Sequence, residues 1–303
     1  MGTWPGGARR LAMHPIAPCA SAPDWTAAMR AGDWERAWTL SESVLFSRDP
    51  ATRDDPRLPY HLRWVWDGTP PDGRHVLVRC YHGLGDVLQF ARYLPELARR
   101  AASVTVEVCD RLICLLNDFP VRLVPFDQAR PLPRSDCDIE IMELALALRI
   151  APDAGESEWL RTDGFTFPAG TTGLCLSSGE WDPARSVDPE WFSARPLQRP
   201  CIALDLGCSS LAVLNPGGCP ADLAATASFI AGCEAIVTVD TMVAHMAGSM
   251  GKPTWLMLRD EPDWRWVPGA ETSAWYASLR LVHQREAGDW APVVAQVRAE
   301  VGL

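Results

Sequence analysis

Residues 236–258 read IVTVDTMVAHMAGSMGKPTWLML, and this stretch predicts a strand, a helix and a second strand in direct succession. The β-branched run ends at Asp240, and apolar residues then recur at helical spacing between Val243 and Met250. Gly251 ends the predicted helix, and the proline two residues later prevents its continuation. A strand that runs straight into a helix places unpaired backbone N–H groups and the positive end of the helix dipole at the carboxyl edge of a sheet. That arrangement is typical of phosphate-binding sites.

Three polar residues stand at this junction. Thr241 and His245 are four residues apart, so we expect their side chains on one face of the first helical turn. Asp240 can cap that turn or accept hydrogen bonds from the hydroxyls of a sugar. The junction alone fits two interpretations equally well: a ligand site, or a capped helix with a polar first turn.

A further βαβ unit is predicted within residues 76–108. Residues 76–80 read as a strand, residues 86–97 keep helical spacing with a bend expected at Pro95, and residues 104–108 alternate as a second strand.

The loop of this unit contains His82, Gly83 and Gly85, and Asp86 opens the helix that follows. We expect the two glycines to let the backbone turn tightly and to expose its N–H groups. A Gly-x-Gly pair by itself fits many turns. Asp86 can cap its helix, act as a base, or do both, and the residue pattern leaves these roles open.

Two longer motifs resemble one known family. GLGDVLQFARYLP at residues 83–95 and DTMVAHMAGSMGKP at residues 240–253 resemble the first loop and the donor-sugar site of glycosyltransferase family 9, the heptosyltransferases. The resemblance implies an α/β protein of the GT-B architecture, in which two Rossmann-like domains face each other across a cleft. It also implies that Asp86 is the catalytic base, because Asp86 matches the family's catalytic aspartate. WVWDG at 64–68 and DWRW at 263–266 resemble family members that are fused to tetratricopeptide repeats.

The same resemblance implies a donor site in the second half of the chain. Ser177 and Ser178 follow a short predicted strand as a candidate phosphate loop. Arg185 matches a basic residue that faces the donor diphosphate in the family, although a surface charge is an equally good interpretation of it. The expected donor-binding residues are therefore Ser177, Ser178, Arg185, Asp240, Thr241 and His245, opposite the loop of His82, Gly83 and Gly85.

Four segments are expected along the 303 residues: a disordered leader at 1–23, a helical prefix and connector at 24–60, an N-terminal Rossmann-like acceptor domain at 61–170, and a C-terminal Rossmann-like nucleotide-sugar domain at 171–303. The prefix reads as a short helical hairpin that resembles one degenerate tetratricopeptide repeat. A lone helix pair cannot bury both of its faces, so it must dock on the rest of the chain or on a partner.

The second domain is expected to be shorter than in the family. Residues 201–206 and 211–214 read as two strands with four residues between them, where family members usually have a helix. Residues 290–301 predict a final amphipathic helix, which in two-Rossmann transferases often returns to brace the first domain. In the first domain, residues 139–148 fit either a helix or a buried strand.

Composition limits the partners. The formal net charge of −10 argues against a nucleic-acid partner and against a polybasic membrane patch. Lys252 is the only lysine, so arginine must supply the positive charge of any phosphate site. The ten cysteines form no Cys-x-x-Cys pair and read as free thiols of a reducing cytoplasm. No apolar run reaches the ~20 residues of a membrane span, so a cytoplasmic location is expected, with contact at the inner face of the membrane left open.

Asp136 and Asp138 match the Asp-x-Asp metal motif of another glycosyltransferase fold. Matches of three residues are common by chance, so we expect a solvent-exposed pair at a strand edge and no metal site.

These expectations combine into one reaction. A sugar is transferred with inversion from a nucleotide-diphosphate donor, with ADP-heptose as the candidate, to a hydroxyl of a glycan, glycolipid or protein. Asp86 removes the hydroxyl proton, and neither a metal nor a cofactor takes part. Two alternatives remain: a non-catalytic scaffold of the same fold, motivated by the shortened second domain, and a sugar-nucleotide epimerase of similar double-domain shape.

Overall fold

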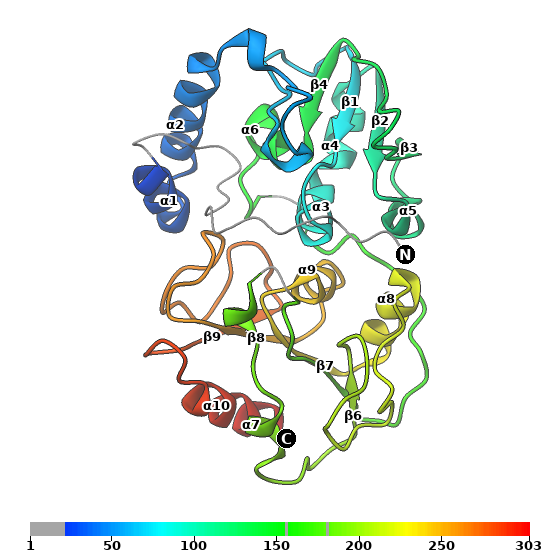
Figure 1. Cartoon of the computed structure of the whole chain (residues 1–303), viewed down its shortest axis with the longest axis vertical. Coiled ribbons are helices and arrows are strands. Elements are labelled where there is room, and N and C mark those ends of the chain that lie inside the picture. The colour runs from blue at the N-terminus through cyan, green and yellow to red at the C-terminus, as the bar shows by residue number, and fades with distance from the viewer. Residues whose placement is uncertain (1–21, 155–156, 180–181) are drawn as a thin grey trace.

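The computed structural model describes residues 22–154, 157–179 and 182–303, so the predicted leader lies outside the described residues except for its last two positions. The chain forms two parallel sheets, one above the other, with helices on their faces (Figure 1). It passes from the first sheet to the second once, through residues 149–171.

The first sheet has the strand order β3-β2-β1-β4. Its strands are β1 (His75–Arg79), β2 (Ser103–Val108), β3 (Arg122–Pro125) and β4 (Cys137–Glu140). Its helices are α3 (Leu84–Phe90), α4 (Leu94–Arg100), α5 (Asp110–Leu116) and α6 (Leu144–Leu148). A short 3-10 segment, Ala91–Tyr93, separates α3 from α4, which is the interruption predicted near Pro95. Residues 139–148 prove to be the end of β4 followed by α6.

The second sheet has the strand order β6-β5-β7-β8-β9, and every neighbouring pair is parallel. Its strands are β5 (Thr172–Cys175), β6 (Cys201–Ala203), β7 (Ala235–Val239), β8 (Thr254–Leu258) and β9 (Leu279–His283). Its helices are α7 (Glu190–Ser193), α8 (Leu223–Gly232), α9 (Met242–Ser249) and α10 (Ala291–Val301). The strand–helix–strand unit predicted at 236–258 is confirmed as β7, α9 and β8, and Gly251, with φ of +70°, ends the helix.

The two halves meet through α3 and α9, which pack against each other. Every residue of α9 from Val243 to Ser249 is buried, because the helix lies between its own sheet and α3. Gly85 permits the close approach of the two helices, because a Cβ there would lie 2.9 Å from Cδ2 of His245. Gly248 lets Tyr276 pack on α9 within the second half, because a Cβ there would lie 2.5 Å from the Tyr276 ring. The apolar core is therefore continuous from one half to the other.

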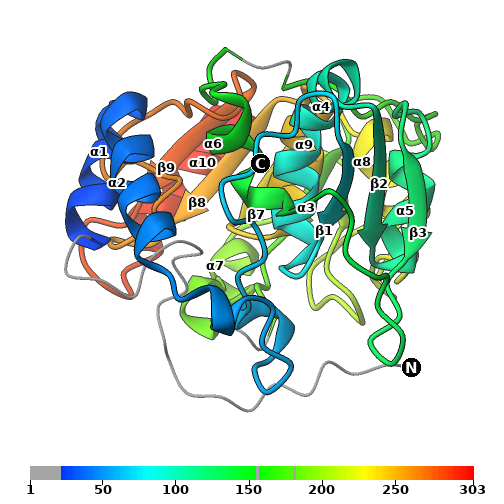
Figure 2. The same cartoon turned by 90° about the horizontal axis from the view of Figure 1, so that it is seen from above.

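A helical hairpin, α1 (Ala22–Ala31) and α2 (Trp34–Ser47), stands beside both halves (Figure 2). Trp25 packs edge-on against Trp264 of the second half, with ring centroids 5.0 Å apart, and Arg30 donates to a carbonyl of the same loop. At the other end, Arg48 pairs with Glu143 of the first half at 3.3 Å. Of the two alternatives, docking on the rest of the chain or on a partner, these contacts show the first.

Residues 211–214 do not form the predicted strand. The side chain of Asn215 instead accepts from the backbone N–H of Ala203 at 2.7 Å and donates to its carbonyl at 2.8 Å. The N–H of Leu214 donates to the Cys201 carbonyl. These bonds satisfy the free edge of β6, so no further strand pairs there.

The last helix does not brace the first half. The apolar face of α10, with Val293, Val297 and Val301, packs on the outer face of the second sheet together with α7. That sheet face would otherwise be exposed, so the helix covers its own domain.

Asp138 is not the solvent-exposed residue that was predicted. It is 2% exposed and pairs with the equally buried Arg79 at 2.9 Å. Arg79 pairs on its other side with Glu107 at 2.6 Å. This ion triad lies inside the first half, and only Asp136 of the pair is exposed.

Candidate functional site

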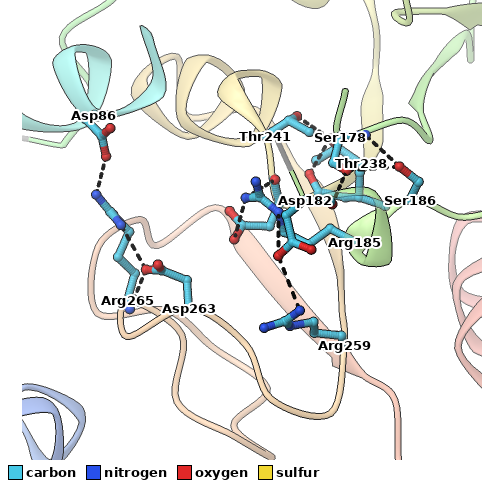
Figure 3. Close-up of polar contacts among 12 residues, drawn as sticks. Asp86, Ser178, Asp182, Arg185, Ser186, Thr238, Thr241, Arg259, Asp263 and Arg265 are labelled. Carbon is cyan, nitrogen blue, oxygen red and sulfur yellow. Dashed lines mark hydrogen bonds and ion pairs between the residues drawn. The ribbon is translucent and has the colours of Figure 1, made fainter. Parts of the chain in front are cut away.

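Asp86 lies in the first turn of α3, at the junction between the two halves (Figure 3). Its Oδ2 accepts from the backbone N–H of Gly83 at 3.0 Å, so Asp86 does cap its helix. Its Oδ1 forms an ion pair with Nη2 of Arg265, from the loop that follows β8 in the second half. Gly83 has an ordinary φ of −68°, and its N–H is bound to this carboxylate rather than exposed as predicted.

Arg265 is held on three sides. Nη1 pairs with Oδ1 of Asp263 at 2.8 Å, Nε donates to Oε1 of Gln89 on α3 at 2.5 Å, and Nη2 binds Asp86. The guanidinium also lies over the Trp264 ring, 4.4 Å from its centroid. Burial alone would lower the pKa of Arg265, but the carboxylates of Asp263 and Asp86 raise it above its usual value. Arg265 therefore joins the two halves as a permanent positive charge.

A second charged group surrounds the end of β7. Nη1 of Arg185 donates to the backbone carbonyl of Asp240 at 2.9 Å and lies 3.4 Å from its carboxylate. Asp182 pairs with Arg259 at 3.2 Å and lies 3.6 Å from Nε of Arg185. Burial, and then the charge of Asp263, raise the pKa of Asp240, while Arg185 opposes that rise. Arg185 is thus paired at the end of β7 and is not an isolated surface charge.

The first turn of α9 is capped by Thr241. Its Oγ1 accepts from the N–H of Val243 at 3.2 Å, so Thr241 has the capping role that was considered for Asp240.

The candidate phosphate loop after β5 is closed by its own chain. Asp205 accepts from the N–H groups of Leu176 and Ser177, each at 2.8 Å. The N–H of Ser178 donates to Oγ of Ser186 at 3.0 Å. These N–H groups are therefore already paired, which differs from an open phosphate cradle.

His245 does not face open space beside Thr241. Its ring is buried, shares a 3.1 Å hydrogen bond between Nδ1 and the hydroxyl of Tyr276, and stacks on Trp266. Burial and the nearby positive charge of Arg265 move the pKa of His245 well below its usual value. The ring is thus neutral at neutral pH, and its Nδ1 is engaged by Tyr276 rather than open to a donor. The four-residue spacing rule applies within a helix, but Thr241 is the N-cap of α9 and has extended backbone angles, φ −145° and ψ 178°.

No protein-family model and no curated protein matches the chain. Several solved structures resemble it. One is a family 9 glycosyl transferase from Veillonella parvula, with a TM-score of 0.53 and 11% identity over 76% of this chain and 90% of that one. Another is the iron-containing dodecameric glycosyltransferase TibC from enterotoxigenic E. coli, with a TM-score of 0.53 and 11% identity over 77% of each chain. A third is the ADP-heptose LPS heptosyltransferase II of E. coli, with a TM-score of 0.52 and 15% identity over 75% of this chain and 98% of that one. Identities this low establish the shared fold and nothing finer.

The chain has the GT-B fold.

In GT-B proteins and other open parallel sheets, ligands bind beyond the carboxyl ends of the strands. This GT-B chain places Asp86 beyond β1 and the group around Asp240 beyond β7. Arg265 contacts Asp86 directly, and its positive charge lowers the pKa of Asp240.

His82 occupies a buried niche of the first half. Its Nδ1 lies 2.9 Å from Oε1 of Glu140, and no described residue lies within hydrogen-bonding distance of its Nε2. Burial favours the neutral ring, but the charge of Glu140 prevails and raises the pKa of His82 to about 9. His82 is thus positively charged at neutral pH.

The sequence prediction missed several charged residues of this site. Asp182 and Arg259 lie near the predicted residues but outside every motif considered, while Asp263 and Arg265 belong to the DWRW motif. That motif carried the only available signal, and it was interpreted as a family marker without a chemical role.

Among the described residues, no group of three or more His, Cys, Asp and Glu side chains is arranged to hold a metal ion. TibC is described as iron-containing, a property of that protein. The nine described cysteines are all free thiols. Within the described ranges no helix has the length and apolar character that crossing a bilayer demands.

Proposed function

We propose that this GT-B chain is a glycosyltransferase that moves a sugar from a nucleoside-diphosphate donor to an acceptor hydroxyl, with inversion at the anomeric carbon. The observation that supports the proposal is that Arg265 pairs with Asp86 from one sheet edge, while its charge and that of its partner Asp263 act on Asp240, which Arg185 binds at the other edge. A carboxylate on one side and arginines on the other match what an inverting displacement needs, a base opposite a leaving anion.

In this reaction Asp86 accepts the proton of the acceptor hydroxyl while the hydroxyl oxygen forms a bond to the anomeric carbon. The bond between that carbon and the diphosphate oxygen breaks, and its electron pair leaves with the diphosphate. Arg185 and the amino end of α9 stabilise the new charge, Ser177 and Ser178 line the approach, and Asp240 holds sugar hydroxyls. Arginine supplies the positive charge, so the proposal requires no metal.

The donor class follows from the resemblance alone. The heptosyltransferase II of E. coli is named for ADP-heptose, so ADP-heptose is the first donor to test, with ADP as its matching product. A glycan, glycolipid or protein hydroxyl is the acceptor class under this proposal.

The test measures ADP release from ADP-heptose in the presence of a glycan and glycolipid panel. Asp86→Asn keeps the size of the side chain and an oxygen for the helix cap, so turnover should fall by ~10²–10⁴ if Asp86 is the base. Asp136→Asn is the matched control, because Asp136 is an exposed aspartate of the same half. An Asp86→Asn enzyme that turns over like wild type would remove Asp86 from this role.

A non-catalytic scaffold is the second candidate. It is favoured by the closed loop at Ser177 and Ser178, whose N–H groups are bound to Asp205 and Ser186. Calorimetric titration with ADP, UDP and GDP separates the candidates, because a scaffold with a decayed pocket gives no binding heat with any of them.

A further inference from the structure

Arg265 occupies the carboxylate that the proposed reaction needs as its base. One guanidinium links the carboxylates of Asp86 and Asp263, which belong to different halves of the molecule. Oδ1 of Asp86 binds Arg265, and Oδ2 accepts from the N–H of Gly83, so both oxygens of the proposed base are engaged. Release of Arg265 would free one of these oxygens for the acceptor proton.

The surroundings of Arg265 fix its backbone and leave its side chain exchangeable. The adjacent Trp264 is 5% exposed and packs edge-on against Trp25 and Trp275, with ring centroids 5.0 and 5.7 Å away. All polar contacts of the Arg265 guanidinium, by contrast, are made to side chains. The guanidinium of Arg185, unlike that of Arg265, also donates to a backbone carbonyl, that of Asp240.

We propose, resting on the function proposed above, that Arg265 exchanges partners during transfer: it pairs with Asp86 in the conformation described here and with the donor diphosphate in the loaded enzyme. A guanidinium keeps its charge in both positions and binds phosphate oxygens as readily as carboxylate oxygens. The exchange frees Oδ1 of Asp86 to accept the acceptor proton. Arg265 then couples the arrival of the donor to the availability of the base.

The alternative is a purely structural clamp. In that case Arg265 joins α3 to the loop after β8, and its removal weakens the contact between the halves without any specific effect on phosphate binding. The two roles differ in what the loss of Asp86 does, because Asp86 competes with the diphosphate for Arg265 only under the exchange.

The test is a double-mutant cycle on ADP binding, measured by calorimetry at fixed ionic strength. Asp86→Asn should tighten ADP binding by about 3- to 10-fold, since the competing carboxylate is gone, and Arg265→Met should weaken it by about 10- to 100-fold. The double variant should bind like Arg265→Met. Arg265→Lys keeps the charge, so its affinity for ADP should lie between those of wild type and Arg265→Met. It replaces Arg265→Met in the cycle if the methionine variant does not fold. Arg280→Met is the control, because Arg280 pairs with Glu300 and is 54% exposed.

Three outcomes overturn the proposal. If Asp86→Asn leaves ADP affinity unchanged or weakens it, no competition exists. If Arg265→Met binds ADP like wild type but melts at a lower temperature, Arg265 is a clamp, and the proposed function still stands. If wild type itself binds none of ADP, UDP and GDP, the proposed function fails and this exchange fails with it.

Discussion

Glu143 provides a sharp test of the electrostatics inside the first half. Its carboxyl is 6% exposed, with Arg48 at 3.3 Å and the buried pair of Glu140 and His82 nearby. Burial raises the pKa of Glu143 to about 7, although Arg48 opposes the rise. Compared with the ordinary pKa of 4.5, this shift means that the folded protein disfavours the ionised carboxylate, relative to the protonated form, by about 3 kcal/mol.

The sign follows from proton binding in the two states. Between pH 4.5 and about 7, the folded protein keeps the Glu143 proton that the unfolded chain has lost, so the free energy of unfolding falls as pH rises through this window. Glu143→Gln has no proton to lose. We therefore expect it to be more stable than wild type by about 1–3 kcal/mol at pH 8, the lower figure allowing for the lost pairing with Arg48, and about equal to wild type at pH 5.

The assay is urea unfolding at pH 5, 6, 7 and 8. His82 contributes to the pH dependence of both proteins between its ordinary pKa of 6.5 and its raised pKa of about 9, so the difference between wild type and variant isolates Glu143. Glu234→Gln is the control, because the Glu234 side chain is 63% exposed, and it should leave the pH profile unchanged. Equal pH dependence in wild type and Glu143→Gln, or a variant less stable than wild type at pH 8, would refute the reasoning.

The remaining predictions concern the junction, the hairpin and metal. Gly85→Ala places a Cβ 2.9 Å from Cδ2 of His245 and should lower the free energy of unfolding by about 1–3 kcal/mol. Removing the His245 ring should relieve this clash, so a Gly85→Ala/His245→Ala double variant whose loss of stability equals the sum of the two single losses would contradict the prediction. Trp25→Ala removes the contact with the second half and should cost about 3–5 kcal/mol in urea unfolding, whereas Phe46→Ala, at a side chain 74% exposed on the same hairpin, should cost less than about 0.5 kcal/mol. Sugar transfer should survive EDTA, and loss of activity that Mn²⁺ restores would count against arginine as the counter-charge.

Local pattern predicted most of the secondary structure, and the resemblance to glycosyltransferase family 9 predicted the GT-B fold. The stretch around Asp240 has strand, helix and turn signals that agree with one another, and the loop before Asp86 has the same property. The strand predicted at residues 211–214 was wrong. The side chain of Asn215 pairs with the edge of β6, and this outweighs the β-branched and apolar character of residues 211–214.

Contacts between the halves could not be predicted in this way. His245 is buried because α3 approaches it at Gly85, and Arg265 is a bridging residue because Asp86 lies opposite it. Each relation joins residues more than 150 positions apart, and no local periodicity encodes it. The prediction that Asp138 is exposed to solvent was wrong for a similar reason, since its buried partner Arg79 lies on a neighbouring strand.

The backbone passes between the two sheets once, so after a cut at that point only side-chain and packing contacts, such as those of α3 with α9, would hold the halves together. The N–H groups of Leu160 and Phe165 donate to carbonyls of Ser249 and Ser228 in the second half, so the connecting segment belongs to that half from at least residue 160 onward. Two polypeptides divided just after Ile150 would carry complete sheets and complementary surfaces, α3 on one and α9 on the other. The gene could be cut there into a split pair whose reassembly is read by complementation, and a half from a related protein could replace either piece.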